Sequence, residues 1–271
     1  MDSLKEQWLI LISTPVYIII IGLELLLSHL QHRKSYTFRD TVTNIYLMLL
    51  NGGIDLGFRI ISLVVLNYFY VRAWISIENV FLYWLLLVLL EDFLYYWLHR
   101  FDHEIRLFWA VHVTHHSSQY FNLTVAGRVN FIFLLYRSLF WAPLCLFGIP
   151  PEMILLIESI TAIPTFLIHT EKVGKLGVLD WIFNTPSNHR VHHASNPEYL
   201  DKNFGGVLMI YDHLFGTYIK ETAAPVYGLT HNIDTHNPSK LLLDEFAKVA
   251  REFIQIKNFP EKFRYLFSRP Q

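Results

Sequence analysis

Long runs of apolar residues alternate with short polar segments along most of the chain. Five runs approach the length of a membrane helix, since about twenty apolar residues span the hydrocarbon core of a bilayer. They cover residues 8–30, 42–70, 79–98, 129–149 and 152–168. The first run is too long, and lacks the small-residue cleavage pattern, for a cleaved signal peptide. The pattern predicts an all-α integral membrane protein with four to five transmembrane or re-entrant helices.

Two places in these runs disfavour a simple series of crossings. The segment NGGIDLG at 51–57 interrupts the second run, so that span is expected to be broken or re-entrant. Pro150 and Pro151 separate the last two runs, which therefore predict a helical hairpin. A hairpin returns the chain to the side it left, so residues 99–128 and 170–271 are expected on the same side of the membrane.

Basic residues between the first two runs indicate which side this is. Arg33, Lys34 and Arg39 lie in that loop, and short loops rich in Lys and Arg tend to remain in the cytosol. Following the crossings from this loop places the polar region that begins at His99 in the cytosol. If residues 42–70 do not cross the bilayer, the orientation changes, but the hairpin still keeps the two polar regions together.

The end of the chain, residues 231–271, predicts a cytosolic helical tail on a single membrane domain formed by residues 1–271. Within it, residues 241–259 carry apolar side chains at helical spacing. These side chains are Leu242, Phe246, Val249, Phe253 and Ile256. Two interpretations remain open for this helix: it packs on the rest of the domain, or it lies on the membrane surface.

The composition agrees with a membrane protein and excludes several other classes. Of the 271 residues, 53% are hydrophobic and 17% are charged, whereas about a quarter are charged in an ordinary soluble domain. A net charge of −1 gives no indication of a nucleic-acid partner. The single cysteine, Cys145, excludes a disulfide framework and a thiolate metal site.

The fourteen histidines are concentrated in the middle of the chain, mostly in three motifs: HRFDH at 99–103, HVTHH at 112–116 and HRVHH at 189–193. Positions i, i+3 and i+4 of a helix share one face, so each motif is expected to aim its imidazoles at a common point. A lone buried histidine is usually a hydrogen-bonded core residue, but so many unpaired imidazoles together need a cation for their lone pairs. The motifs predict a site for more than one metal ion. The predicted ligands are His99, His103, His112, His115, His116, His189, His192 and His193.

Several other polar residues are candidates for this site. His169 follows the predicted hairpin at the level where the motifs begin, and is a further candidate ligand. Three roles remain open for His213: a metal ligand, a residue that contacts the ligands, or a structural histidine. Carboxylates beside the motifs are candidates for orienting the imidazoles through their second N–H, with a solvated surface acid as the alternative. The polar candidates around the metals are Asp92, Asp102, Glu104, Asn188, Asp201 and Asp212.

The motif spacing excludes several common active sites and leaves others open. The zinc-protease motif HExxH is absent, because Leu107 stands where the second histidine would follow His103 and Glu104. Neither GxSxG nor a phosphate-binding P-loop is present. Imidazole suits zinc, iron, copper and nickel, and open positions on such a site could bind dioxygen. A metal transporter, a non-catalytic lipid sensor and a metal-dependent hydrolase remain alternatives to an oxidase.

The three histidine motifs resemble the histidine boxes of the fatty acid hydroxylase/sterol desaturase superfamily, the integral-membrane di-iron oxygenases. Residues 92–128 and 184–218, together with YGLT at 227–230, are similar to the alkylglycerol monooxygenase-like branch. The resemblance covers roughly residues 80–230. It implies a cytosol-facing di-iron centre capped by helices, with His169 and the eight motif histidines as ligands.

The resemblance also implies a reaction. Two iron ions, for which zinc or nickel would substitute on purification, would use O2 to hydroxylate or desaturate a C–H bond of a membrane lipid such as a sterol, fatty acyl chain or alkylglycerol. No fused cytochrome b5-like or flavin domain is visible, so an external electron donor is expected. The expected location is the bacterial inner membrane or the endoplasmic reticulum.

Overall fold

The computed structural model describes the backbone of residues 2–270 and the side chains of residues 14–270. Within this range the protein is helical, and its β pairing consists of isolated bridges, so the all-α prediction is confirmed. The elements are α1 (Asp2–Leu30), α2 (Phe38–Tyr70), α3 (Val80–Glu104), α4 (Arg106–His116), the 3-10 helix η1 (Leu123–Gly127), α5 (Phe133–Leu146), α6 (Pro151–Leu167), α7 (Val178–Ile182), α8 (Pro186–His192), α9 (Ile210–Phe215), α10 (Pro238–Gln255) and α11 (Phe259–Phe267).

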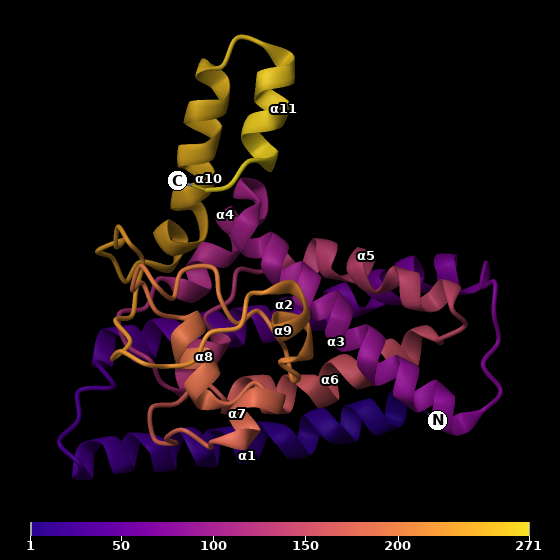
Figure 1. The fold of residues 1–271 in the computed structure, drawn as a ribbon, viewed down its shortest axis with the longest axis horizontal. Helices are drawn as coiled ribbons and strands as arrows, with labels where there is room; N and C mark the ends of the chain where they lie inside the picture. The colour runs from indigo at the N-terminus through magenta and orange to yellow at the C-terminus, as the bar shows by residue number, and fades with distance from the viewer. Residues whose placement is uncertain (1, 271) are drawn as a thin grey trace.

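The long helices α1, α2, α3, α5 and α6 lie side by side along the longest axis of the molecule (Figure 1). Helix α2 packs on α5, α1 packs on α6, and α3 contacts both α5 and α6. Their shared apolar core includes Leu66, Leu87, Trp141 and Ile154. The segments α4, η1 and α7–α9 gather at one end of this bundle, while α10 and α11 stand out from it as a hairpin (Figure 1). The bundle thus presents one polar end, which is called the cap from here on.

Helix α2 is continuous, so the prediction of a break at residues 51–57 is wrong. The side-chain amide of Asn51 donates to the carbonyl of Leu47, one turn earlier in α2, at 2.8 Å. It also donates to the carbonyl of Val129, in the segment after η1, at 2.6 Å. Asp55, within the same stretch, pairs with Arg137 of α5 at 2.7 Å. These tertiary contacts outweigh the weak helix propensity of glycine, which costs about 1 kcal/mol per residue relative to alanine.

The predicted hairpin is present as α5 and α6. A tight turn at Gly148 (φ 83°) joins the two helices, and α6 begins at Pro151. With 14 and 17 residues, these helices are about 21 Å and 26 Å long at roughly 1.5 Å per residue. Both are shorter than the ~30 Å hydrocarbon core of a bilayer. Helices α2 and α3 are the described helices with both the length and the apolar character to cross a membrane.

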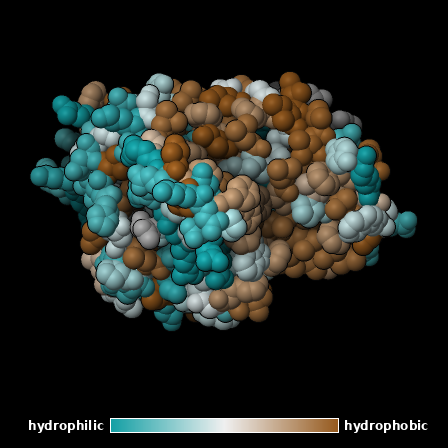
Figure 2. Space-filling view, turned by 90° about the horizontal axis from the view of Figure 1, so that it is seen from above, coloured by the Kyte–Doolittle hydropathy of each residue, from teal (hydrophilic) through white to brown (hydrophobic). Residues whose placement is uncertain are grey.

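The surface of these two helices is unlike that of a soluble core. Only 11% of the apolar window of α2 and 22% of that of α3 is buried, and side chains such as Ile60 and Phe81 are exposed. Figure 2 shows hydrophobic residues covering one half of the visible face and hydrophilic residues gathering over the other, at the cap. Exposed apolar areas of this extent mark contact with lipid or protein rather than water.

Charged side chains join three helices inside the apolar half. Arg137 on α5 lies 2.7 Å from the carboxylate of Asp55 on α2 and 3.8 Å from that of Glu158 on α6. Asp55 also pairs with Arg59 one turn along α2, at 2.9 Å. In an apolar surrounding, paired charges hold helices in one register because each unpaired charge would be costly.

We expect Arg137→Met to lower the stability of the protein in detergent, by roughly 1–2 kcal/mol, the upper range for interhelical polar contacts in membrane proteins. The substitution leaves Asp55 and Glu158 without their shared cation. Thermal unfolding followed by circular dichroism measures the effect, with Arg251→Met on the exposed face of α10 as the matched control. An equal change in both variants would contradict a bridging role for Arg137.

Candidate metal centre

The nine predicted histidines lie on four elements that meet at the cap end of the bundle. His99 and His103 occupy the last turns of α3, and His112, His115 and His116 lie on α4. The extended residue Ile105 (φ −115°, ψ 119°) separates the two helices and turns the chain between the first two motifs. The third motif lies on α8 and its C-cap residue, and His169 follows the end of α6. Both HxxHH motifs are therefore helical, as their spacing predicts.

These histidines form two groups whose candidate ligand atoms lie within 4.8 Å of one another in each group. The first group comprises His99, His103, His112, His116 and His192; the second comprises His115, His169, His189 and His193. The structure thus brings together all nine histidines, including His169. We call the two groups the five-histidine cluster and the four-histidine cluster.

The prediction that each HxxHH motif aims at one point is wrong, because both motifs divide between the clusters. On α4, His112 and His116 belong to the five-histidine cluster, while His115 belongs to the other. Neighbouring residues on an α-helix are about 100° apart around its axis. His115 and His116 therefore face two adjacent sites, whereas residues four apart face the same one.

The ring nitrogens crowd together in a way that suits cations. In the four-histidine cluster, Nε2 of His169 lies 2.9 Å from that of His189 and 3.3 Å from that of His115. In the other cluster, His112 and His116 bring their Nε2 atoms to 3.1 Å. A neutral imidazole has a single N–H, so three mutually close nitrogens cannot all be satisfied by hydrogen bonds among themselves.

Two nitrogens of the five-histidine cluster are also buried without a partner among the described residues: Nε2 of His103 and Nε2 of His192. Burial without a hydrogen bond costs several kcal/mol unless another group, such as a cation, takes the lone pair. The donor set therefore fits one metal ion in each cluster.

Burial keeps the histidines of α4 and α8 in the uncharged form that binds metals. It lowers the pKa of each well below the ordinary value, and the neighbouring imidazoles lower it further because two adjacent charges would repel. The residues affected are His112, His115, His116, His189, His192 and His193.

Backbone carbonyls orient three of the rings. Nδ1 of His99 lies 2.9 Å from the carbonyl oxygen of Phe204, and Nδ1 of His169 lies 2.8 Å from that of Thr165. Nδ1 of His192 lies 3.0 Å from the carbonyl oxygen of Lys202. A carbonyl only accepts, so each Nδ1 carries the proton and each Nε2 offers its lone pair to the cluster. Motif spacing does not reveal such partners, because every residue has a carbonyl.

Of the predicted carboxylates, two lie beside histidine rings. An oxygen of Asp102 is 3.9 Å from Nδ1 of His112, and one of Asp201 is 3.6 Å from Nδ1 of His103. Both distances exceed a direct hydrogen bond. Asp102 accepts a hydrogen bond from Tyr136 at 2.8 Å, which leaves its other oxygen directed toward the cluster.

The other polar candidates support the cap rather than the rings. Glu104 pairs with Arg100 and Arg269, while Asn188 donates to the carbonyls of Asp180 and Phe183. Asp212 accepts from the backbone N–H groups of Phe204 and Gly205 and so fixes the loop whose carbonyl meets His99. Asp92 likewise accepts hydrogen bonds from the backbone N–H groups of Val207 and Leu208. His213 belongs to neither cluster; its Nε2 lies 2.9 Å from the carbonyl of Trp181.

A cavity of about 380 Å³ reaches both clusters. His99, His112, His115, His169 and His189 form one part of its wall. The rest is mostly apolar and comes from α1–α6, η1 and the segment that follows η1, with Leu98, Val111, Val129, Phe133 and Phe166 among the lining residues. The volume is at the lower end of the range for ligand sites in proteins, ~300–1,000 Å³.

A comparison with protein families matches residues 84–217 to the fatty acid hydroxylase family. This stretch holds all nine clustered histidines. The chain carries a fatty acid hydroxylase domain. The resemblance inferred from the histidine motifs is therefore confirmed.

Relatives of known activity match far beyond this hydroxylase domain. Alkylglycerol monooxygenase from Homo sapiens is 38% identical over 268 residues, and that from Xenopus tropicalis is 35% identical over 264 residues; each alignment covers 95% of this chain. The chain spans 58% of the length of both proteins. An ornithine lipid hydroxylase from Rhizobium tropici is 36% identical over 132 residues, 48% of this chain and 40% of its own. No solved structure matches the chain.

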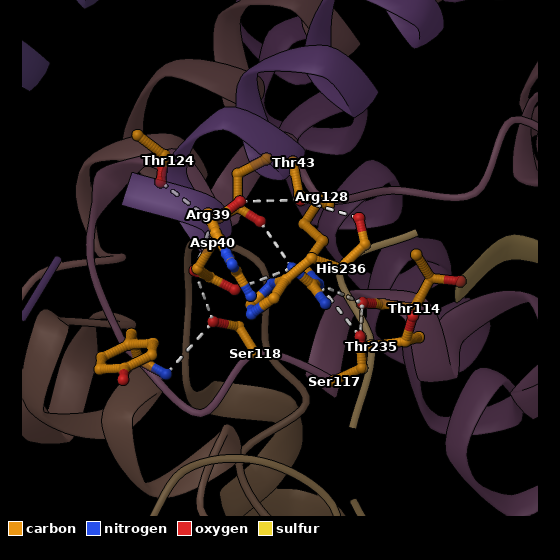
Figure 3. A network of polar contacts seen from close by, with 12 residues as sticks. Arg39, Asp40, Thr43, Thr114, Ser117, Ser118, Thr124, Arg128, Thr235 and His236 are labelled. Carbon is orange, nitrogen blue, oxygen red and sulfur yellow. Dashed lines mark hydrogen bonds and ion pairs between the residues drawn. The ribbon is translucent and has the colours of Figure 1, made fainter. Parts of the chain in front are cut away.

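A buried ion pair that the histidine motifs did not indicate supports the hydroxylase domain. Arg128 is buried and lies 3.0 Å from the carboxylate of Asp40 at the start of α2 (Figure 3). Its Nε donates to the carbonyl of Thr114 and to the hydroxyl of Ser117, at 3.1 Å and 3.0 Å. Thr114 and Ser117 flank His115 and His116, so Arg128 ties the ligand-bearing end of α4 to α2.

We expect His115→Ala and His116→Ala each to reduce bound metal from about two ions per chain toward one, because each removes a donor from a different cluster. Metal analysis of protein expressed with excess iron measures this. His236→Ala, at an exposed histidine outside both clusters, is the control. Unchanged metal content in both cluster variants would contradict the assignment.

We expect Arg128→Met to cost roughly 3–5 kcal/mol of stability, because it leaves the buried charge of Asp40 uncompensated. The double variant Arg128→Met/Asp40→Asn should recover part of this loss, since neither charge remains. Thermal unfolding and metal content are measured together, because displacement of α4 should also loosen both clusters. A double variant less stable than the single one would show that the pair itself is not the source of the effect.

Proposed function

We propose that the chain is a membrane-bound di-iron oxygenase that hydroxylates a C–H bond of a lipid. One observation carries the proposal: two buried clusters of neutral imidazoles border the same apolar cavity. The names of the relatives support it, since alkylglycerol monooxygenases and an ornithine lipid hydroxylase are lipid-oxidising enzymes. Because this chain spans little more than half of the monooxygenases, its activity is inferred from its own site as well.

The donor set would hold two iron ions. His99, His103, His112, His116 and His192 would hold one, and His115, His169, His189 and His193 the other. Both clusters consist of imidazoles, which bind zinc and nickel as well as iron. Zinc or nickel acquired during purification would therefore occupy the same positions without supporting the reaction.

When bound, the iron pair supplies the activation of O2 and the oxidation of an unactivated carbon. In overall balance, one C–H bond, one O2, two electrons and two protons give one C–OH group and one water. In this proposal an external donor supplies the two electrons. Loss of a second hydrogen in place of hydroxyl transfer would give an alkene by the same site.

The cavity suits a hydrocarbon segment rather than a polar head group next to the histidines. Its polar lining residues are largely engaged elsewhere: Asn130 donates to the carbonyl of Leu242, and Thr165 to that of Thr161. Asp102 already accepts from Tyr136. A polar substrate group would find few free partners there, whereas a methylene chain needs none. We therefore infer a membrane lipid with a sterol, acyl or alkyl portion as the substrate.

The bilayer would surround the apolar half of the bundle, with the cap in water. This arrangement follows from the exposed apolar faces of α2 and α3 (Figure 2). The basic loop between α1 and α2 lies at the cap end of the bundle, which supports a cytosolic position for the clusters. The membrane would be a bacterial inner membrane or the endoplasmic reticulum, and the lipid would enter sideways between helices.

Lipid-dependent O2 consumption tests the proposal. Protein purified without oxygen and loaded with iron should consume O2 when a reductant and a long-chain lipid are both added, with hydroxylated lipid detected by mass spectrometry. Ala162 lines the cavity, so Ala162→Trp would fill part of the space for the lipid. It should lower kcat/KM by about tenfold without changing metal content. Leu139→Trp, on the exposed surface of α5, is the control. Stoichiometric iron with no lipid-dependent O2 use would overturn the proposal.

A further inference from the structure

The hairpin formed by α10 and α11, here the C-terminal hairpin, has two different faces. Leu241, Leu242 and Val249 on α10 are buried where the helix meets α4. Helix α10 therefore packs on the domain; it ends at Gln255, and a second helix follows. Helix α11 has no fully buried residue. Part of the hairpin therefore still lacks a partner within the chain.

An aromatic stripe runs along the outer side of α11. Phe259 is 78% exposed, Phe263 is 61% exposed and Phe267 is 47% exposed. Their spacing of four residues places them on one side of the helix, and the rings of Phe263 and Phe267 lie 4.6 Å apart. Tyr265 and Leu266 are partly buried, and the hydroxyl of Tyr265 donates to Glu252 of α10 at 2.5 Å. Three exposed phenylalanines on one short helix form an apolar surface that water does not favour.

The hairpin is held rigidly, so the direction of the stripe is fixed. Arg106, at the corner between α3 and α4, binds the end of the hairpin. Its backbone N–H donates to the carbonyl of Ser268 and its guanidinium to the carbonyl of Arg269, both at 2.9 Å. The same guanidinium stacks 4.4 Å above the ring of Tyr265. Arg269 in turn donates to Glu104 at 2.8 Å. The end of α11 is thereby clamped between the first two histidine motifs.

The hairpin stands out sideways from the bundle, across the direction of its long helices (Figure 1). If α2 and α3 cross the bilayer, the hairpin therefore runs along the membrane plane. Residues 257–264 of the hairpin are also basic: they contain Lys257, Lys262 and Arg264 but a single acid, Glu261. A helix with aromatic residues on one side and an excess of cations suits the interface of an anionic bilayer.

We propose that the C-terminal hairpin is a membrane-surface element, with Phe259, Phe263 and Phe267 inserted among the lipids on the cytosolic side. A second copy of the chain fits the surface less well. The nine residues of α11 give a face of about 14 Å by 10 Å, far below the ~800 Å² that each partner buries in a stable dimer. The inference rests on the proposed bilayer insertion of the bundle, but not on the oxygenase reaction.

Site-specific fluorescence in vesicles tests this. In a Cys145→Ala background, Phe263→Cys is labelled with an environment-sensitive fluorophore, and the protein is reconstituted in phosphatidylcholine vesicles with or without phosphatidylglycerol. Glu261→Cys, exposed on another side of α11, is the matched control. Val64→Cys, exposed on the apolar face of α2, reports on insertion of the bundle itself.

The expected result is strong quenching of the label at position 263 by lipids that carry a nitroxide on the acyl chain, increased by phosphatidylglycerol, and weaker quenching at position 261. Equal exposure of positions 261 and 263 to aqueous iodide, with position 64 still quenched by lipid, would overturn this inference alone. Failure of position 64 as well would overturn the insertion on which it rests. Energy transfer between labelled copies at position 263 would show that a second chain, and not lipid, covers the stripe.

Discussion

The burial of nine imidazoles in two small groups is the constraint on which the rest of the structure depends. Each ring nitrogen that leaves water without a partner costs several kcal/mol, and the clusters place Nε2 atoms as close as 2.9 Å to one another. Charging the rings does not relieve this, because burial and mutual repulsion lower their pKa. The scaffold must therefore hold these lone pairs in place for cations, and many of its other features serve that need.

Those features act at the backbone of the ligand-bearing helices. Carbonyls of Phe204 and Lys202 take the Nδ1 protons of rings on α3 and α8, and Asp212 fixes the loop that presents Phe204. Arg128 holds the last turn of α4 against α2. Such partners resist rotation of the rings, and a metal site is sensitive to that rotation because its ligands must keep a common focus.

The sequence was sufficient to predict the histidines and the hairpin, but not their supports. Histidine spacing and apolar periodicity are local properties, so the clustered histidines and the turn at Pro150 could be predicted from the sequence alone. The continuity of α2 through residues 51–57 depends on Asn51 reaching the carbonyl of Val129, a contact between distant segments. For the same reason no sequence motif marks Arg128, and backbone carbonyl partners leave no trace in residue type.

The division of each HxxHH motif explains why the two clusters must be built together. A helix that presents residues i and i+4 to one site presents residue i+3 to the neighbouring site. Helix α4 therefore gives His112 and His116 to the five-histidine cluster and His115 to the four-histidine cluster; α8 makes the reverse division, with His192 alone in the former. Neither helix can shift toward one cluster without leaving the other. Two clusters that share their helices in this way keep a fixed separation, which the reaction proposed for the adjoining cavity would require.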